Sequence, residues 1–422
     1  MRILVLWVEK ILELKYKESL FISILWLTRF LSMQHPMNIT IQFIDQIHDV
    51  SLLEWNRIAG TDYPFMRYEF LAALEICGAV SPENGWTPKH LVAYNPAGKL
   101  VAIAPCYLKD HSYGEYVFDW SWANAYHKNS VAYYPKLLIA IPFTPCAGPR
   151  LVVAPDQDIT TVTRQCLQAI TVLGQQSRVS SWHLLFPHAA LVKQLDQAQY
   201  EIGLMQRIGS QYHWHNDGYE TFDDYLGAMT SRKRKTIRRE REKVAAQGIT
   251  FLRLGGEEIS AAQLKDFYVF YHATYMKRGS YGYLNHDFFE QLVGTMPEKL
   301  LFVFAQKEGE SVASALFLLG GGAIYGRYWG CLELYDQLHF ETCYYQGIEY
   351  CIDRKLTHFD AGAQGEHKIQ RGFKPIETYS YHWITHSGFR DAIENYLQYE
   401  NAHIREYIDQ SQSSLPFKQI NG

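Results

Sequence analysis

The segment AGAQGEHKIQRGFKP, residues 361–375, carries side chains that suit general acid–base chemistry. Glu366 or His367 could take a proton from an attacking amine, while Lys368 or a backbone N–H could stabilise a developing oxyanion. The segment follows a short strand expected at THFD, and loops at strand ends often carry functional residues. We therefore expect Glu366 and His367 to be catalytic. The alternative is an exposed ionic loop in which Arg371 pairs with Glu366.

A second segment, HSYGEYVFDWSWANAY (residues 111–126), combines aromatic rings with Glu115 and Asp119. Buried charge is costly unless it is paired, so acids among aromatics favour the wall of a binding cleft; a plain core strand is the alternative. We expect the first half to be a strand whose alternate residues face opposite sides. The residues expected to contact substrate here are Tyr113, Glu115, Asp119, Trp120, Trp122 and Tyr126.

Six further residues complete the expected substrate site. Tyr325 and Arg327 lie in the string YGRY, which resembles YGEY of the segment above, and the others lie in the loop 361–375. Guanidinium and ammonium groups hold anionic substrate groups well because their hydrogen bonds are charge-assisted. The loop residues expected to bind substrate are Gln364, Lys368, Arg371 and Lys374.

Residues 231–241, SRKRKTIRRER, hold seven Lys or Arg and are predicted to form one helix that ends at Gly248. Like charges three and four residues apart repel each other, and an acidic ligand would relieve that repulsion. We expect an anion-binding face made by Arg232, Arg234 and Arg238, suited to a pyrophosphate, a nucleotide or an RNA backbone. The alternative is a solvated helix face.

The composition limits the classes of protein that need consideration. Forty Lys and Arg oppose 44 Asp and Glu, so the net charge of −4 provides no general attraction for nucleic acid or membranes. Seven scattered Cys without a C-x-x-C pair indicate reduced thiols in a cytoplasmic protein. The sequence has no glycine-rich phosphate-binding motif to support ATP or a dinucleotide. His213 and His215 have no evident third ligand, so we expect no metal.

The first 36 residues stand apart from the rest. Their apolar stretch SLFISILWL is bracketed closely by Lys15, Lys17 and Arg29, so it is too short for a membrane span, and it has no signal-peptide cleavage site. We expect residues 1–36 to be an extension outside the fold, with the folded chain starting at Met37 and no stable membrane insertion. The alternative is an amphipathic helix at a membrane surface.

The chain repeats itself. Four pairs of similar strings occur in the same order at a nearly constant offset, which indicates an internal duplication. They are YPFMRYEFLAALE with YGYLNHDFFEQLV, HLVAYNPAGKLVAIAPCYL with LLFVFAQKEGESVASALFL, YGEY with YGRY, and Tyr133-Tyr134 with Tyr344-Tyr345. In the second copy, hydrophobic periodicity predicts the order β-α-α-β-β-β-α-β-β, with helices over 260–277 and 340–354.

That element order resembles the GNAT acyltransferase fold, and two copies in one chain resemble the Fem-type enzymes, which transfer aminoacyl groups onto peptidoglycan precursors. Long strings, among them PFTPCAGPRL, SRKRKTIRRER and AGAQGEHKIQRGFKP, are similar to the Fem-like family of peptidoglycan biosynthesis or recognition proteins. The resemblance implies an α+β fold of two tandem GNAT-like domains, expected at 37–207 and 208–422, the second ending in a C-terminal helix.

The resemblance also implies an N-acyltransferase that joins an acyl or aminoacyl group to an amine of a cell-wall precursor or peptide. A non-catalytic protein that binds a peptide or precursor in the same cleft is the alternative. Acyl-CoA and aminoacyl-tRNA both stay open as donors, because WGCLELYDQLHFET lacks the pyrophosphate-binding motif of ordinary GNAT enzymes and no long helical hairpin is evident. The expected partners are an anionic small-molecule or precursor substrate and a tRNA, in the cytoplasm.

Overall fold

The computed structural model describes residues 39–277, 279–363 and 365–418. The extension predicted at residues 1–36 and the predicted substrate residue Gln364 lie outside these residues. Within the described chain, residues 41–93 and 100–418 belong to one compact unit, and 94–99 form a turn that is assigned to a separate small unit. No helix in the described ranges has both the length and the hydropathy that crossing a membrane requires.

The first half of the chain alternates short strands and helices. The helix α5 buries one apolar face, with Val162, Cys166 and Ile170 at helical spacing, whereas α3 buries five consecutive residues, 70–74. The helices are α2 (Leu52–Ala59), α3 (Tyr68–Ile76), α4 (Trp120–Lys128), α5 (Ile159–Gln176) and α6 (Ala189–Ile202). The strands are β1 (Thr40–Ile44), β2 (Trp86–Pro88), β3 (His90–Tyr94), β4 (Leu100–Ala104), β5 (Cys106–Lys109), β6 (Lys136–Ile139), β7 (Val152–Val153), β8 (Ser181–Leu185) and β9 (Met205–His215).

The second half has the element order predicted for it. A capping box between Ser260 and Gln263 begins the helix predicted at 260–277, and the Asn285 side chain caps the next one. The helices are α7 (Phe222–Ala228), α8 (Ser231–Ala246), α9 (Ala261–Met276), α10 (His286–Thr295), α11 (Leu338–Phe340), the π-helical turn η5 (Glu341–Tyr345), α12 (Gln346–Asp353), the 3₁₀-helix η6 (Glu366–Arg371) and α13 (Ser387–Ser413). The strands are β10 (Ile249–Gly255), β11 (Leu300–Lys307), β12 (Glu310–Gly320), β13 (Ala323–Cys331), β14 (His358–Asp360) and β15 (Lys374–Ile384).

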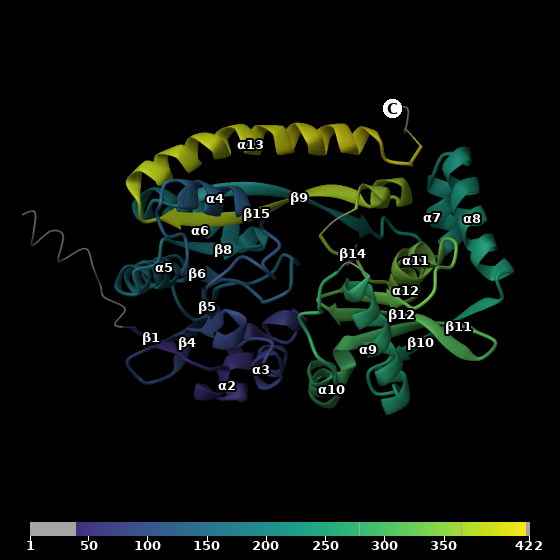
Figure 1. The fold of residues 1–422 in the computed structure, drawn as a ribbon, viewed down its shortest axis with the longest axis horizontal. Coiled ribbons are helices and arrows are strands. Elements are labelled where there is room, and N and C mark those ends of the chain that lie inside the picture. The colour runs from purple at the N-terminus through teal and green to yellow at the C-terminus, as the bar shows by residue number, and fades with distance from the viewer. Residues whose placement is uncertain (1–38, 278, 364, 419–422) are drawn as a thin grey trace, which may run out of the picture. The chain divides into compact units, whose positions relative to one another are not determined.

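The two copies share one sheet. Among the described residues, eleven strands pair in the order β10-β11-β12-β13-β14-β9-β15-β8-β6-β5-β2, and a smaller sheet has the order β1-β3-β4-β7. β9 from the first copy lies between β14 and β15 of the second, and β15 lies between β9 and β8 of the first. Each copy therefore contributes its last strand to the other copy. Figure 1 shows the long helix α13 running along β9 and β15.

Strand pairing confirms the α+β class, and it also corrects part of the predicted repeat. The first two string matches align α3 with α10 and the β3–β4 hairpin with β11–β12, as expected. β6 pairs in parallel with β8, just as β13 pairs in parallel with β14, so β6 is the strand of the first copy that corresponds to β13. The predicted match of YGEY with YGRY, which lies in β13, is therefore wrong. The Tyr133-Tyr134 match is also wrong, because that pair precedes β6 whereas Tyr344-Tyr345 are helical.

The strand predicted in the first half of HSYGEYVFDWSWANAY is wrong. β5 ends at Lys109, and the chain then forms turns until α4 begins at Trp120. Gly114 (φ 82°) and Tyr116 (φ 62°) have left-handed backbone conformations, which a pleated strand cannot contain. The expected alternation of faces therefore does not apply to this segment.

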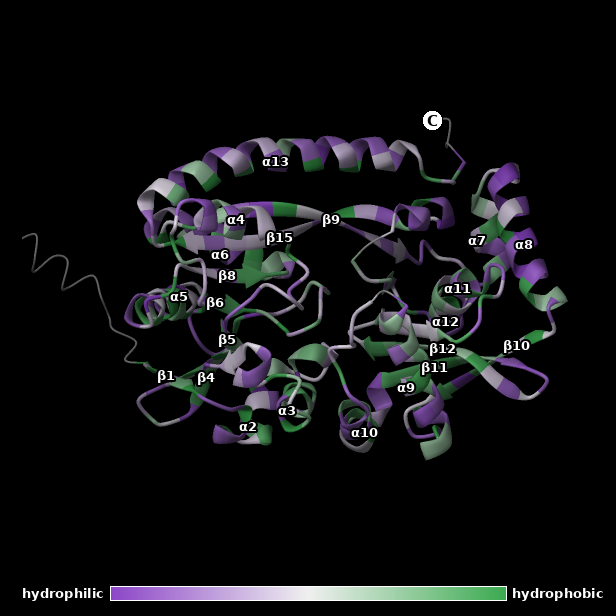
Figure 2. Cartoon of the chain, viewed as in Figure 1, coloured by the Kyte–Doolittle hydropathy of each residue, from purple (hydrophilic) through white to green (hydrophobic). Residues whose placement is uncertain are grey.

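An extensive aromatic and aliphatic cluster packs the part of the sheet that the second copy completes. It joins the sheet at β9, β11, β12 and β13 to the buried faces of α7, α8 and α12. Figure 2 shows α8 as hydrophilic over most of its length, in contrast to the hydrophobic strands beside it. Only Ile237 and Val244 of α8 are fully buried, and most of its other residues are exposed.

The predicted domain boundary between residues 207 and 208 stays a prediction, and it falls inside β9. Because β9 and β15 each complete the other copy's part of the sheet, we expect both copies to unfold in one calorimetric transition. Trp214→Ala leaves a cavity at a fully buried position on β9 and should lower the free energy of unfolding by about 3–5 kcal/mol. The protein should still unfold in a single transition. Tyr200→Ala, at a 90% exposed position, is the control. Two resolved transitions would contradict the shared-sheet interpretation.

Candidate functional site

The sheet forks between β13 and β14. These strands pair in parallel only from Ala323–Tyr325 with His358–Asp360. β13 then continues to Cys331, whereas β14 ends at Asp360 and the residues after it leave the sheet. A cavity of about 240 Å³ lies at this fork, and its lining includes Tyr116, Gly326, Arg327, Tyr328, Tyr344 and Ala361.

Arg327 is the extra residue of a β-bulge at the fork. Leu316 pairs with Tyr328 and Phe317 pairs with Gly326, so Arg327 has no residue opposite it on β12. A bulge leaves one residue out of the hydrogen-bonded ladder and redirects its side chain, and bulges are frequent beside active sites. The backbone of β13 is therefore irregular where it borders the cavity.

Two cations line a neighbouring cavity of about 280 Å³, which shares Arg327 with the first. Arg327 donates a hydrogen bond to the carbonyl of Phe143 at 2.5 Å, and Lys368, which is 1% exposed, donates to the carbonyl of Gly362 at 2.7 Å. Burial lowers the pKa of Lys368 to about 8, although Asp360 opposes the shift. Lys368 is therefore mainly protonated at neutral pH, and the cavity suits an anionic group.

Asp360, the last residue of β14, supplies the nearby negative charge. It is 1% exposed, and it accepts a hydrogen bond from the Gly362 N–H at 2.9 Å and lies 3.6 Å from His213. Burial would raise the pKa of Asp360, but the His213 ring and the Gly362 N–H lower it below its usual value. The carboxylate thus stays ionised and partly offsets the charge of Lys368.

Residues 112–118, the wall segment, border the same cavities. Tyr116 lines both of them, and its left-handed backbone is of the kind that concentrates at functional sites. The Phe143 N–H donates to the carbonyl of Gly114 at 3.0 Å. A Cβ at Gly114 would lie 2.6 Å from the Phe143 ring, so this close approach requires glycine.

A buried lysine ties the wall segment to the sheet. Lys136, the first residue of β6, is fully buried and donates to Ser112 at 2.8 Å, Glu115 at 2.7 Å and Asp119 at 2.5 Å. Burial raises the pKa of Glu115 to about 7 despite Lys136. For Asp119 the opposing effect of Lys136 outweighs burial and lowers the pKa to about 2. Glu115 and Asp119 therefore hold the wall in place, and their predicted contact with substrate stays a prediction.

The predicted catalytic pair lies at the start of η6, and both residues are exposed. The hydroxyl of Tyr407 donates to Glu366 at 2.8 Å, whereas the Nε2 atom of His367 shares a hydrogen bond of 2.8 Å with the hydroxyl of Tyr344. Glu366 thus contacts α13, and His367 contacts η5 beside the fork. These contacts place the two side chains near different cavities, and their catalytic roles stay predictions.

Residues 46–419 match a family of proteins described as FemAB-like, peptidoglycan biosynthesis/recognition. The chain belongs to the FemAB-like family. This confirms the resemblance drawn from the sequence. A search of curated proteins found no match.

Two solved structures show the fold of this FemAB-like protein. The crystal structure of FemX superposes with a TM-score of 0.52 at 11% identity, covering 82% of this chain and 98% of FemX. The C-terminal domain of a putative lysylphosphatidylglycerol synthetase from Agrobacterium fabrum gives a TM-score of 0.50 at 10% identity, covering 82% of this chain and 96% of that one. The predicted fold, two tandem GNAT-like copies in one α+β chain, is confirmed.

The other aromatic residues predicted to bind substrate differ in exposure. Tyr113 and Trp120 are 56% and 38% exposed, line the cavity beside the fork and pack edge to face at 5.0 Å. Trp122 and Tyr126 are buried in a cluster with the end of β15 and the start of α13. Tyr325 is 7% exposed and packs edge-on against two aromatic rings of the first copy. Tyr113 and Trp120 are therefore the accessible members of this group.

Two further predicted substrate residues of the FemAB-like chain are paired within the protein. Arg371 pairs with Glu240 at 2.9 Å and lies 3.4 Å from the ring centroid of Phe340. Lys374 pairs with Asp217 at 2.8 Å. Both side chains thus have a partner before any substrate arrives.

The predicted anion-binding face lies on α8. Arg232 and Arg238 are exposed; Arg238 pairs with the exposed Asp223 at 2.9 Å, and Arg234 donates to the hydroxyl of Ser231 at 3.4 Å. Arg241, on another side of the helix, pairs with one carboxylate of η5 and one of α12. Arg241 therefore anchors α8, and the exposed arginines are held only by surface contacts of small energetic weight.

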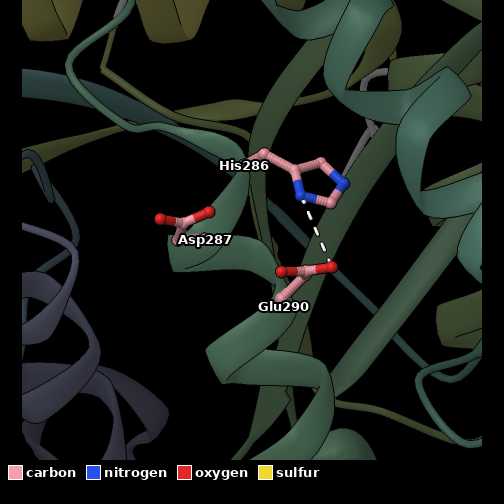
Figure 3. Close-up of side chains that lie close together, drawn as sticks. All are labelled: His286, Asp287 and Glu290. Atoms are coloured by element: carbon pink, nitrogen blue, oxygen red, sulfur yellow. Dashed lines mark ion pairs between the residues drawn. The ribbon is translucent and has the colours of Figure 1, made fainter.

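One group of side chains in the described residues has a spacing that could hold a metal ion: His286, Asp287 and Glu290. Figure 3 shows all three on α10, with His286 joined to Glu290 by an ion pair of 3.6 Å. Both carboxylates are exposed, and exposed acids commonly lie together on a helix without binding a metal. We assign no metal to this group.

The sequence prediction omitted Tyr116, Tyr344 and Lys136. In the expected strand, Tyr116 and Glu115 would face opposite sides, and Tyr344 enters the sequence analysis only through its match to Tyr133 in the repeat. A signal for Lys136 exists, because it is the one charge at the start of the apolar run KLLIAI, and a charge that opens a buried strand needs a partner. Glu115 in the wall segment and Asp119 directly after it were candidates for that partner.

Lys136→Met should destabilise the protein strongly, because it leaves Glu115 and Asp119 buried without their cation. Loss of one partner of a buried pair costs about 3–5 kcal/mol, measured here by chemical denaturation. Lys128→Met removes an exposed charge from α4 and should stay within about 0.5 kcal/mol. Equal midpoints for the two variants would show that Lys136 does not hold the wall segment.

Proposed function

We propose that this FemAB-like protein is an N-acyltransferase that joins an acyl or aminoacyl group to an amine of a peptidoglycan precursor. The observation that carries the proposal is the fork between β13 and β14, with a bulge at Arg327 and the ammonium of Lys368 beside it. A carbonyl placed at the fork would meet β13 backbone that is not fully used in the ladder.

In the proposed reaction, the amine nitrogen attacks the carbonyl carbon of the acyl donor. The new C–N bond forms as the C–S bond of an acyl-CoA or the ester C–O bond of an aminoacyl-tRNA breaks. A backbone N–H of β13 or the ammonium of Lys368 would stabilise the oxyanion of the tetrahedral intermediate. The amine gives up a proton to a base, and the leaving sulfur or oxygen takes one up. Positioning and electrostatics suffice for this chemistry, so no covalent enzyme intermediate is required.

Glu366 is the base that we favour. Its carboxylate lines a groove that adjoins the cavity holding Lys368, and its hydrogen-bond partner is the neutral phenol of Tyr407. His367 is the second candidate, because its ring shares a hydrogen bond with Tyr344, which lines the cavity at the fork. Desolvation and the cations Arg371 and Lys368 lower the pKa of His367, so its imidazole is neutral at pH 7. A neutral imidazole could orient the donor or replace Glu366 as base.

The cations of the site suit either class of acyl donor, and both classes favour the same cellular location. Arg327 and Lys368 suit the anionic part of either donor, and the arginines of α8 suit the backbone of a tRNA. Both donor classes are made in the cytoplasm, and we therefore propose a cytoplasmic protein.

Replacing Glu366 by Gln keeps its shape and removes the base, so the transfer rate should fall about 10²–10⁴-fold. The assay uses the purified protein with a stem-peptide precursor and, in separate reactions, labelled aminoacyl-tRNA or acyl-CoA. His367→Ala should reduce the rate less, and Glu394→Gln, an exposed carboxylate elsewhere on α13, is the control. Full activity in Glu366→Gln would remove this residue from the chemistry. Precursor binding without transfer from either donor would instead support the recognition protein.

The α8 arginines should provide much of the binding to tRNA. Arg234→Gln with Arg238→Gln should weaken tRNA binding. The slope of log K against log salt concentration should become less steep by about two, one unit for each lost phosphate contact, as measured by filter binding. Lys193→Gln with Lys265→Gln removes two exposed charges from α6 and α9 and is the control. If both double variants bind tRNA equally, α8 is only a solvated surface.

A further inference from the structure

A groove of about 490 Å³ adjoins the cavities at the fork. β9 and β15 form its floor, and the wall segment and α13 contribute to its sides. It shares Tyr116, Phe118 and Ala363 with the cavity that holds Lys368, so the two spaces are neighbours. Figure 1 shows α13 passing along the two strands that form this floor.

The floor of the groove includes three small residues, Gly209, Thr378 and Ser380. Gly209 on β9 lies opposite Thr378 on β15, and Arg207 lies opposite Ser380. A Cβ at Gly209 would come within 2.9 Å of the Thr378 hydroxyl, so even alanine would crowd this point. Small residues at the centre of a long paired sheet thus preserve space for a ligand.

Two groups in the groove are suited to accept hydrogen bonds from a ligand. Gln211 is 2% exposed; its side-chain nitrogen donates to the carbonyl of Pro145 at 2.7 Å, and its Oε1 atom has no partner in the described part of the chain. A buried amide oxygen without a partner carries a desolvation cost, which an N–H donor would relieve. Glu366 lines the same groove with a carboxylate that forms no ion pair among the described residues.

The charge of the groove is opposite to that of the cavity beside it. Arg207 is neutralised by two hydrogen bonds to Glu400, at 2.6 and 2.7 Å, which leaves Glu366 as the uncompensated charge. The neighbouring cavity carries Arg327 and Lys368. An ammonium would be attracted to the groove and repelled by the cavity, whereas an anionic donor would have the opposite preference.

We propose that this groove binds the amine-bearing substrate, as a peptide whose free amino group reaches Glu366 and whose amide N–H is accepted by Gln211. The role of this groove as the acceptor site rests on the proposed acyl transfer. The anionic donor then occupies the cavity at the fork, and Tyr116, which lines both spaces, stands between donor and acceptor.

The test measures binding in the absence of any acyl donor. The probes are a trialanine amide with a free amino group and its N-acetylated derivative, observed by saturation-transfer NMR with the full-length protein. The free-amine peptide should bind about tenfold more tightly than the acetylated one, because its ammonium can form a charge-assisted hydrogen bond with Glu366. Glu366→Gln should remove this preference, and Glu394→Gln should keep it.

Gly209→Ala tests the groove itself, since it narrows the floor without removing a charge. The variant should bind both peptides more weakly, and its denaturation midpoint shows whether the fold is intact. Gly294→Ala, on α10 where an added Cβ meets nothing within 4 Å, is the control and should bind both peptides normally. Equal binding of the two probes by the wild-type protein, or no binding of either, overturns the proposal. If transfer occurs while Gly209→Ala and Glu366→Gln bind the peptides as the wild type does, acyl transfer stands and the groove assignment is wrong.

Discussion

The insertion of β9 between β14 and β15 is the interaction on which the rest of the structure depends. β14, which forms one side of the fork, is only three residues long, and β9 from the first copy supports its outer edge, with Trp214 opposite Phe359 and His213 opposite Asp360. A strand this short has too few hydrogen bonds to stay in place alone. The fork of the second copy therefore exists because the first copy supplies the neighbouring strand.

The first copy also supplies the parts that enclose the site. The chain between α4 and β7, longer than its counterpart in the second copy, provides the carbonyl of Phe143 to Arg327 and the carbonyl of Pro145 to Gln211. Its own equivalent of the fork, between β6 and β8, is extended by a parallel bridge from Gly148 to Pro187. The second copy thus has the open fork, and the longer chain of the first copy supports it.

Local periodicity predicted the second copy almost completely, because α9, α10 and the strands β10 to β13 follow from the spacing of their apolar residues and from caps such as Ser260 and Asn285. The wall segment was mistaken for a strand because its aromatic residues have high strand propensity. Its turn instead includes Gly114, which contacts Phe143 far along the chain, and no local pattern contains that contact. The candidate loop 361–375 was found from its residue types. Its side-chain partners could not be, since they come from η5 and α13.

The opposite charges of the groove and the cavity have a chemical consequence where the two meet. An amine must lose a proton before it can attack a carbonyl, and a nearby positive charge lowers the pKa of an ammonium. A substrate amine that moved from the groove toward Lys368 would therefore release its proton more readily, and Glu366 would be behind it to accept that proton. The same two charges that sort the substrates by sign would thus also favour the neutral, reactive form of the amine at the point of transfer.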